Sequence, residues 1–440
     1  MSKSTVRETY RGVESLPVET LSRALRYLFV NACFANIQSV LVRYSVMQVC
    51  RFWCAALCGD PSCWSQFYVS LQMPVDVLEE WLRRVGQTSF ALTMDFNYDR
   101  GQHFGDAFLR LEELFDPLRG HFKRCYALSV RAGGGKLCDR LFSLLLPVPF
   151  PSMTHLDLDV KFAFELSFFD FARAKGFTKL TYLSFHRTFP SGDWTPFLVG
   201  ITTVKLAAID DFSRPTLADF HSFLSAMPDL EFLILHDLDC LFPPQFYKDD
   251  TPLIPRTQPM PSLTRLEVSS DNPMHTWLLA SLDAPALSHF TLHTASETML
   301  SLLPGRCGGL LNSVTSFILW SGVTKLSVLG DLLGSMPSLQ DLDGRYARFS
   351  FSTVFYMLTM QREQFCPQLK RVVLSQIGPA LVDDLLLSRP GTNFSRDFQV
   401  LCVTASNDRY RAFCVVPFDV SDAKVVRGKE LDYIDFLDDL

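Results

Sequence analysis

Apolar residues recur in one short pattern along most of the chain, at positions 1, 4 and 6 of a six-residue segment. This pattern favours a strand, and the stretches between the segments, residues 217–227 for instance, carry apolar residues at helical intervals. Successive segments lie about 27 residues apart, within the range of known strand–helix repeats. Ten segments fit the pattern, and they begin at Met153, Leu180, Ile201, Leu230, Leu263, Leu287, Val314, Leu339, Leu369 and Phe398. Weaker copies begin at Ser89 and Cys125.

A strand and a helix repeated at this period predict an α/β solenoid with a parallel sheet on its concave side. We expect it to occupy residues 89–420. The pattern resembles a leucine-rich repeat, but the ninth position, usually Asn or Cys, holds other residues here, so we expect irregular curvature. The proline-rich residues 241–263 lengthen one repeat and are expected to form a surface loop, because proline fits neither a helix interior nor a central strand.

The N-terminal part follows a helical pattern instead. Apolar residues at residues 46–58 fall on one helical face, and the sequence Gly-Asp-Pro at residues 59–61 predicts the helix end through a left-handed glycine. Four cysteines lie here, at Cys50, Cys54, Cys58 and Cys63. Cys50 and Cys58 would lie about 12 Å apart along the axis, too far to share one zinc ion. We therefore expect these cysteines to pack in the core, with a metal or redox site as the alternative.

Two motifs frame this helical part: LPVETL at residues 16–21 and VCRFW at residues 49–53, followed by Cys63 and Trp64. Together they resemble the F-box over residues 15–68. The resemblance implies docking to the Skp-type adaptor of an SCF-type ubiquitin ligase, and through it to a cullin ligase. The alternative is a helical cap on the repeats. The residues that the resemblance assigns to adaptor binding are Leu16, Pro17, Leu21, Leu25, Leu28, Val49, Cys50 and Trp53.

A connecting helix is predicted at residues 69–88, with Asp76 and Glu79 as a capping box and Gly86 as its end. Residues 1–14 are expected to be flexible, and residues 421–440 to form an acidic cap or tail. The whole arrangement resembles fungal-type F-box proteins with C-terminal degenerate leucine-rich repeats. That resemblance implies a substrate receptor that binds a target protein, and the alternative is an interaction scaffold without a ligase role.

The strand pattern also selects the residues that would contact a target. Positions 4 and 6 point into the core, so positions 3, 5 and 7 should face the open side of the sheet. Five of the nine histidines fall in this set, together with the aromatic and arginine side chains typical of interfaces. A merely solvated face is the alternative. The candidates are His155, Asp157, Tyr182, His186, Phe232, His236, Arg265, Glu267, His289, His293, Trp320, Arg345 and Arg371.

We expect neither a metal nor an enzymatic site on this face. His186, His236 and His293 share one column but come from alternate repeats, about 9–10 Å apart at ordinary strand spacing, which predicts that they share no metal. A thiolate enzyme would need a low-pKa cysteine beside a base, and the predicted strands pair no cysteine with a histidine. The sequence therefore predicts a non-catalytic protein without a cofactor.

Composition narrows the range of partners. The chain has 440 residues with 48% hydrophobic residues and a net charge of -6, and it holds no dense basic block. We therefore expect a folded protein that does not bind nucleic acid. No signal-type segment or membrane-length apolar run occurs in the sequence. We expect a cytoplasmic or nuclear protein without membrane contact, whose twelve cysteines stay reduced.

Overall fold

The computed structural model divides into two compact units, residues 1–192 and 193–440. The residues that it describes are 17–30, 37–97, 104–133, 135–160, 177–190, 198–209, 213–238, 240–241, 257–320, 325–344, 366, 368–375, 399–406 and 409–415. Leu16, Arg345 and the acidic end at residues 421–440 lie outside these ranges. No helix among the described residues has the length and hydropathy needed to cross a membrane.

The first unit opens with four helical segments. They are α1 Val18–Val30, α2 Ile37–Val49, α3 Arg51–Gly59 and the 3-10 helix η2 Pro61–Trp64. We refer to residues 17–64 as the helical module.

The continuous helix predicted over residues 46–58 is wrong, because Cys50 adopts an extended conformation (φ -164°, ψ 170°) that separates α2 from α3. The predicted end at Gly59 is confirmed, but the chain leaves the helix through an extended Asp60 rather than a left-handed glycine.

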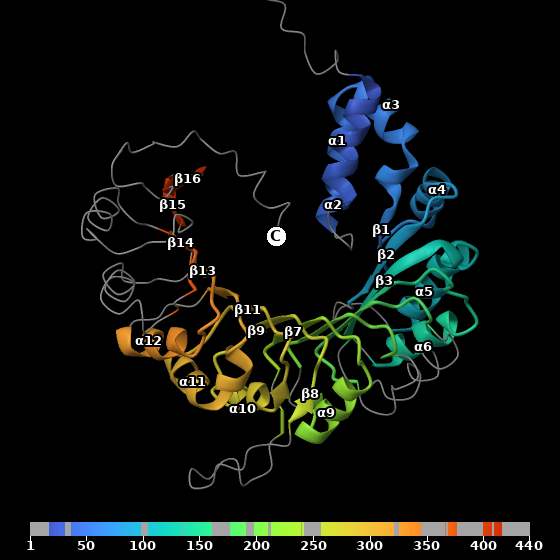
Figure 1. Ribbon diagram of the computed structural model, residues 1–440. Helices are drawn as coiled ribbons and strands as arrows, with labels where there is room; N and C mark the ends of the chain where they lie inside the picture. Colours follow the sequence, from blue (N-terminus) through green and yellow to red (C-terminus); the bar gives the residue numbers. More distant parts are fainter. Residues whose placement is uncertain are drawn as a thin grey trace, which may run out of the picture. The chain divides into compact units, whose positions relative to one another are not determined.

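The first unit continues as a parallel sheet with helices on one of its faces (Figure 1). Its strands, adjacent in chain order, are β1 Gln66–Ser70, β2 Phe90–Phe96, β3 Cys125–Ala132, β4 His155–Val160 and β5 Tyr182–His186. The connecting helices are α4 Val75–Val85, α5 Phe104–Arg119, the short η3 Phe122–Arg124 and α6 Gly135–Leu145. The sheet therefore begins at Gln66, one strand earlier than the repeat pattern indicated.

The second unit repeats the same alternation. Its main strands are β6 Thr203–Ala207, β7 Phe232–His236, β9 Arg265–Ser269, β11 His289–Leu292, β12 Ser316–Leu319, β13 Asp341–Gly344, β14 Arg371–Ser375, β15 Gln399–Ser406 and β16 Arg409–Val415. All pair in parallel except β16, which is antiparallel to β15. The helices are α9 Leu217–Ser225, α10 His275–Ala280, α11 Glu297–Leu311 and α12 Leu326–Gly334. Two short strands, β8 Gln258–Pro259 and β10 Leu282–Asp283, form a separate pair.

Every strand that the sequence pattern predicted is present, including the two weaker copies, which form β2 and β3. The predicted mixed α/β fold with a parallel sheet is therefore confirmed. The helix predicted at residues 217–227 is confirmed as α9, and a capping box between Thr216 and Asp219 starts it. Helix α9 forms for local reasons. Its apolar residues recur at helical spacing, and the side-chain cap satisfies backbone N–H groups that have no partner within the helix.

For helix α4, the predicted end is confirmed and the predicted start is wrong. Gly86 ends the helix with φ +54°, as expected of a glycine at this position. The capping box of Asp76 and Glu79 is wrong, because the helix begins at Val75 and places Asp76 inside the first turn. Pro74 occupies the cap position and has no side-chain hydrogen bond to offer.

The core of the second unit follows the strand alternation. Leu233 and Leu235 in β7, and Leu266 and Val268 in β9, are almost completely buried. Their neighbours along each strand are half-buried or exposed on the opposite face. The alternation therefore leaves a sheet face whose side chains stand in register on adjacent strands.

Candidate functional site

A buried arginine holds the helical module together. The Arg43 guanidinium donates a hydrogen bond from Nε to the Cys63 carbonyl at 2.9 Å. It also lies 5.0 Å from the ring of Phe29 in α1 and 5.9 Å from that of Trp81 in α4. Burial lowers the pKa of Arg43 to about 10. One side chain from α2 thus links α1, η2 and α4.

Trp64 in η2 forms the second anchor of the module. Its indole N–H donates to the Leu57 carbonyl at 2.8 Å, and its ring packs edge-on against Trp81 at 6.1 Å. The guanidinium of Arg84 lies 4.4 Å above the same ring. This tryptophan was part of the F-box-like pattern, and its position explains why the local fold needs it: it joins α3 to α4.

The structure separates the predicted adaptor-binding residues by exposure. Leu21 and Leu25 are buried, so they pack inside the module and offer a partner no surface in this conformation. Pro17 is exposed, Val49 is 59% exposed, and Cys50 and Trp53 are half-buried. Leu16 and the side chain of Leu28 lie outside the described residues. The predicted face therefore mixes interior residues with surface residues.

The exposed apolar residues of the module include Val18 and Val49 from the F-box-like motifs and three, Tyr27, Val42 and Tyr44, that the motifs did not identify. Among the described residues ten large apolar side chains are exposed, and five of them belong to α1 and α2. They are Val18, Tyr27, Val42, Tyr44 and Val49. Helical spacing alone could have indicated part of this set, because Val42 and Val49 are seven residues apart and share one face of α2.

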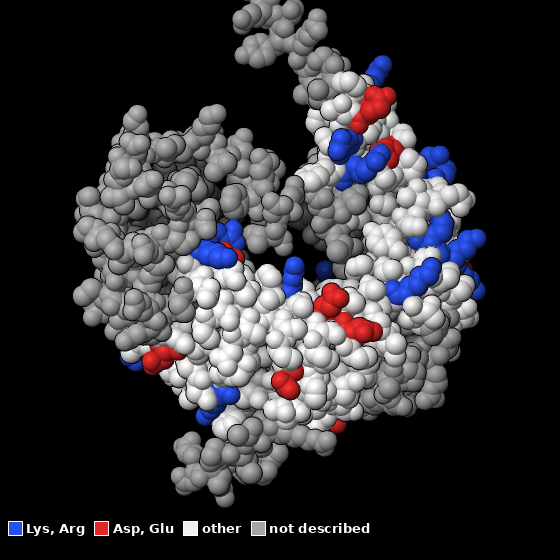
Figure 2. All heavy atoms as spheres, in the orientation of Figure 1, with Lys and Arg blue, Asp and Glu red and all other residues white. Residues whose placement is uncertain are grey.

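Charged side chains of both signs lie on the module, and two of them, Arg26 and Asp60, form an ion pair. Figure 2 shows positive and negative side chains close together over the module. Asp60 accepts a hydrogen bond from Arg26 at 2.8 Å and from the Ser62 N–H at 3.0 Å. The outward surface therefore combines locally paired charges with exposed apolar residues, a composition suited to a protein partner.

The described cysteines have the environment of packing residues. Cys63 is buried, and Cys50, Cys54 and Cys58 are half-buried. Burial raises the pKa of Cys63, Cys125, Cys307 and Cys366 to about 12. A thiol with such a pKa stays protonated at neutral pH, whereas a nucleophile needs the thiolate.

On the first unit, the predicted face residues are engaged with one another. The rings of His155 and Tyr182 stack at 5.4 Å. Asp157 is only 8% exposed and accepts a hydrogen bond from the Ser129 hydroxyl at 2.7 Å, while His186 lies 3.8 Å from its other oxygen. The prediction that Asp157 faces a target is therefore wrong, because neighbouring side chains on the sheet enclose its carboxylate.

On the second unit, the predicted residues form a more open surface, which we call the sheet face. The strand register places Phe232, Arg265 and His289 side by side on adjacent strands. Arg265 and His289 are exposed, and Trp320 is 41% exposed. Farther along, Arg371 donates to Asp341 at 2.9 Å. Arginine and aromatic side chains exposed together are the composition of a protein-binding surface.

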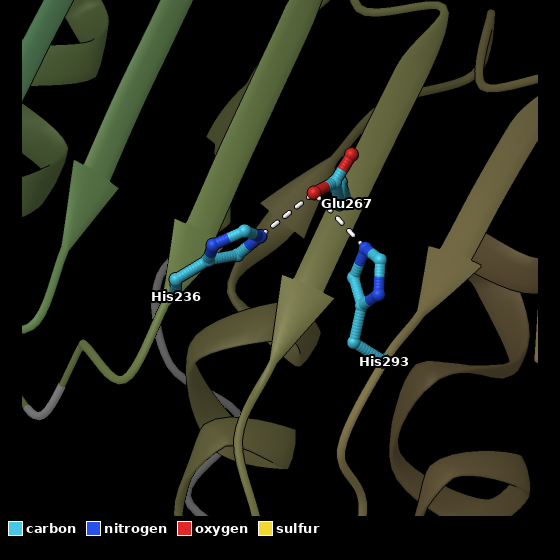
Figure 3. A group of neighbouring side chains, drawn as sticks. All are labelled: His236, Glu267 and His293. Carbon is cyan, nitrogen blue, oxygen red and sulfur yellow. Dashed lines mark hydrogen bonds and ion pairs between the residues drawn. The ribbon is translucent and has the colours of Figure 1, made fainter. Parts of the chain in front are cut away.

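Three sheet-face residues converge on one point: His236, Glu267 and His293 (Figure 3). The Nε2 atom of His236 lies 2.7 Å from Oε1 of Glu267, and Nε2 of His293 lies 3.0 Å from the same oxygen. The prediction that His236 and His293 lie too far apart to share an ion is therefore wrong. Their side chains lean toward each other over the intervening strand β9, and potential ligand atoms of all three residues lie within 4.8 Å of one another.

The electrostatics of this cluster favour a charged carboxylate. Burial alone would raise the pKa of Glu267, but contacts with His236 and His293 outweigh it and lower the pKa to about 2. The ring of Trp320 lies 4.9 Å from that of His293 and borders the cluster. Sequence reasoning selected all four residues as members of one face but missed that Glu267 joins the two histidines.

Comparison with known proteins leaves the family of this chain open. No family model matches it, and no curated protein does. Among solved structures the chain is similar to the crystal structure of a protein from Bacteroides fragilis that was a structural genomics target. The match has 12% sequence identity and a TM-score of 0.30, and it covers 76% of this chain and 75% of that one. At this TM-score the likeness carries no argument about fold or function.

Proposed function

We propose that this chain is a non-catalytic substrate receptor of an SCF-type ubiquitin ligase, with an F-box at its N-terminus and leucine-rich repeats behind it. In this proposal the helical module docks a Skp-type adaptor, and the repeat surface binds a target protein. The receptor acts by raising the effective concentration of the target near the conjugating enzyme.

The exposed apolar side chains of α1 and α2 are the observation that carries the proposal. A short helical module that leaves Val42 and Val49 in water on one helical face gains free energy when a partner covers them, at roughly 25 cal/mol per Å² of apolar surface buried. The F-box-like motifs lie in the same module, and the family docks its adaptor through apolar helical surfaces.

The sheet face supports the second half of the proposal. Its Phe232, Arg265 and His289 are partly or fully exposed on neighbouring strands, and Trp320 is exposed directly after β12. A rigid sheet holds such side chains at fixed spacing, so that little conformational entropy is lost when a target binds. Chemistry at a cysteine is disfavoured here, because burial raises the thiol pKa values described above.

A charge-insertion experiment tests adaptor docking. The double variant Val42→Lys, Val49→Lys places two charges on the exposed face of α2, where an apolar partner surface would have to desolvate them. Leu109→Lys, Leu146→Lys is the matched control, because these side chains are 65% and 38% exposed and lie outside the module. Binding of the purified full-length protein to a recombinant Skp-type adaptor is measured by calorimetry.

We expect the module variant to lose adaptor binding by at least about tenfold, the effect of one unpaired charge at an interface core, while the control binds like the parent. Equal losses in both variants would contradict the assigned face. A parent that binds no Skp-type adaptor would sink the ligase role and leave the interaction scaffold as the better interpretation.

A further inference from the structure

Backbone register fixes the three residues of the cluster in place. His236 is the last residue of β7 and pairs with Ser269 of β9, and Glu267 stands two residues earlier on that same strand. The N–H of His293 donates to the Val268 carbonyl at 2.8 Å, which ties the residue after β11 to β9. Two of the three side chains therefore stand on adjacent strands of one sheet, and the third stands on the residue directly after β11, which a backbone hydrogen bond holds against β9.

The donor atoms of the three side chains are gathered around one carboxylate oxygen, which His236 contacts through a hydrogen bond. A single carboxylate oxygen lies between two imidazole nitrogens, at 2.7 and 3.0 Å. Nε2 of His293 is buried and, although close to Oε1, is not aligned to donate a hydrogen bond to it or to any other described atom. An imidazole nitrogen in this position can bind a metal ion through its lone pair when the ring proton is on the other nitrogen.

We propose that His236, Glu267 and His293 form a binding site for a divalent transition-metal ion of the zinc class, on the sheet face of the second unit. Two imidazoles and one carboxylate are a donor set that zinc accepts, with bonds of about 2.0–2.2 Å. Ligand atoms on a tetrahedral ion then lie about 3.3 Å apart. The two carboxylate–imidazole contacts, at 2.7 and 3.0 Å, are shorter than this spacing, and all pairs of ligand atoms lie within 4.8 Å, so binding an ion requires the side chains to adjust around it.

The site leaves one coordination position open. Each of the three side chains keeps about a quarter of its surface exposed, 27% for His236, 23% for Glu267 and 25% for His293. Three protein ligands leave a fourth position, which water or a donor atom of a bound molecule fills. The ring of Trp320 borders the cluster beside His293. The inference rests on this geometry alone and does not depend on the proposed ligase role.

Metal titration of the full-length protein tests the site. The protein, freed of any affinity tag and stripped with EDTA, is titrated with Zn²⁺ by calorimetry and with Co²⁺ by visible absorption. The variants are His236→Asn, His293→Asn and Glu267→Gln, and His289→Asn is the matched control on the same face. Glutamine at position 267 can still accept hydrogen bonds from the imidazoles, and circular dichroism with the thermal midpoint in EDTA confirms that each variant is folded.

We expect the parent to bind one Zn²⁺ at this site. Each ligand variant should lose affinity by at least the roughly 10–100-fold that follows loss of an outer-shell partner, and the His289→Asn variant should bind like the parent. Absence of Zn²⁺ uptake by the parent overturns the proposal, as does uptake that the three variants leave unchanged. A thiolate charge-transfer band in the Co²⁺ spectrum would place the ion on cysteines. Equally tight Mg²⁺ binding would show an oxygen-only site.

Discussion

The helical module and the sheet face of the second unit distribute polarity in opposite ways. In the module a charged side chain, Arg43, lies at the centre, while Val42 and Val49 face water. In the sheet the aliphatic residues Leu266 and Val268 are buried, while Glu267 and its two histidine neighbours stand on the open face. The module follows a helical repeat and the sheet follows the two-residue alternation of a strand. The module exposes apolar side chains, whereas the sheet face exposes titratable ones.

This difference indicates two kinds of recognition. An apolar helical surface gains free energy from any complementary apolar partner, with little demand on individual atoms. A sheet holds its strands about 4.8 Å apart and lets side chains from neighbouring strands meet at defined distances. The module is therefore suited to docking a protein, whereas the sheet face can also assemble a site from single atoms.

The largest expected effect is on the interior of the module. Arg43→Ala removes a fully buried side chain and leaves the Cys63 carbonyl without its donor. We expect a loss of about 2–5 kcal/mol in local stability, the range for truncating a large buried side chain. Hydrogen exchange should show lost protection in α1–α3, with the strands of the second unit unchanged. Arg51→Ala, at an exposed position of α3, is the control and should leave exchange unaltered.

A smaller effect is expected at Asp60, which caps η2. Burial favours the neutral acid, but the hydrogen bonds from Ser62 and Arg26 outweigh it and lower the pKa of Asp60 below its ordinary 3.8. The ionised group therefore adds stability above its ordinary pKa, and this contribution is lost as the pH falls through the lowered value. Asp60→Ala should cost about 1 kcal/mol at pH 7.

Urea unfolding of the parent and the Asp60→Ala variant at several pH values checks this window. The difference in unfolding free energy should stay constant down to about pH 4 and shrink below it. A difference that grows on acidification would mean that the cap does not act through its charge.

On the sheet face, the exposed pair of Asp341 and Arg371 should matter less. Nε of Arg371 lies 2.9 Å from the carboxylate, and the two side chains are 35% and 38% exposed. A pair in this setting contributes about 0.2–1 kcal/mol. A double-mutant cycle with Asp341→Ala and Arg371→Ala measures it, and the coupling should fall further at high salt. A coupling well above this range would show that the open face is less solvated than its exposure indicates.

The smallest effect on stability is expected on the outside of the module. Tyr27→Ser truncates a side chain that is 58% exposed, and surface changes of this kind usually stay within about 0.5 kcal/mol. The thermal midpoint should therefore match the parent, while adaptor binding weakens. A clear drop in the midpoint would mean that Tyr27 packs inside the module. The module would then expose less apolar surface than its comparison with the sheet face assumes.

The amino-acid pattern by itself determined the parallel strands from β2 to β15, apart from the short β8 and β10, and which side of these strands is buried in the described core. Apolar residues at positions 1, 4 and 6 carry that information locally, because a strand alternates its faces with a period of two. They also placed His236, Glu267 and His293 on the same face. Helical spacing predicts packing for the four-cysteine segment, but it does not predict the break at Cys50.

Only the tertiary structure decided which side chains meet. His236 and His293 are separated by a whole strand, and their meeting depends on how far each leans across β9 toward Glu267. Arg43 likewise reads as a surface residue of α2 until Phe29, Cys63 and Trp81 surround it. A periodic pattern specifies the face on which a side chain lies, but contacts across strands and helices depend on register and packing, which no local pattern contains.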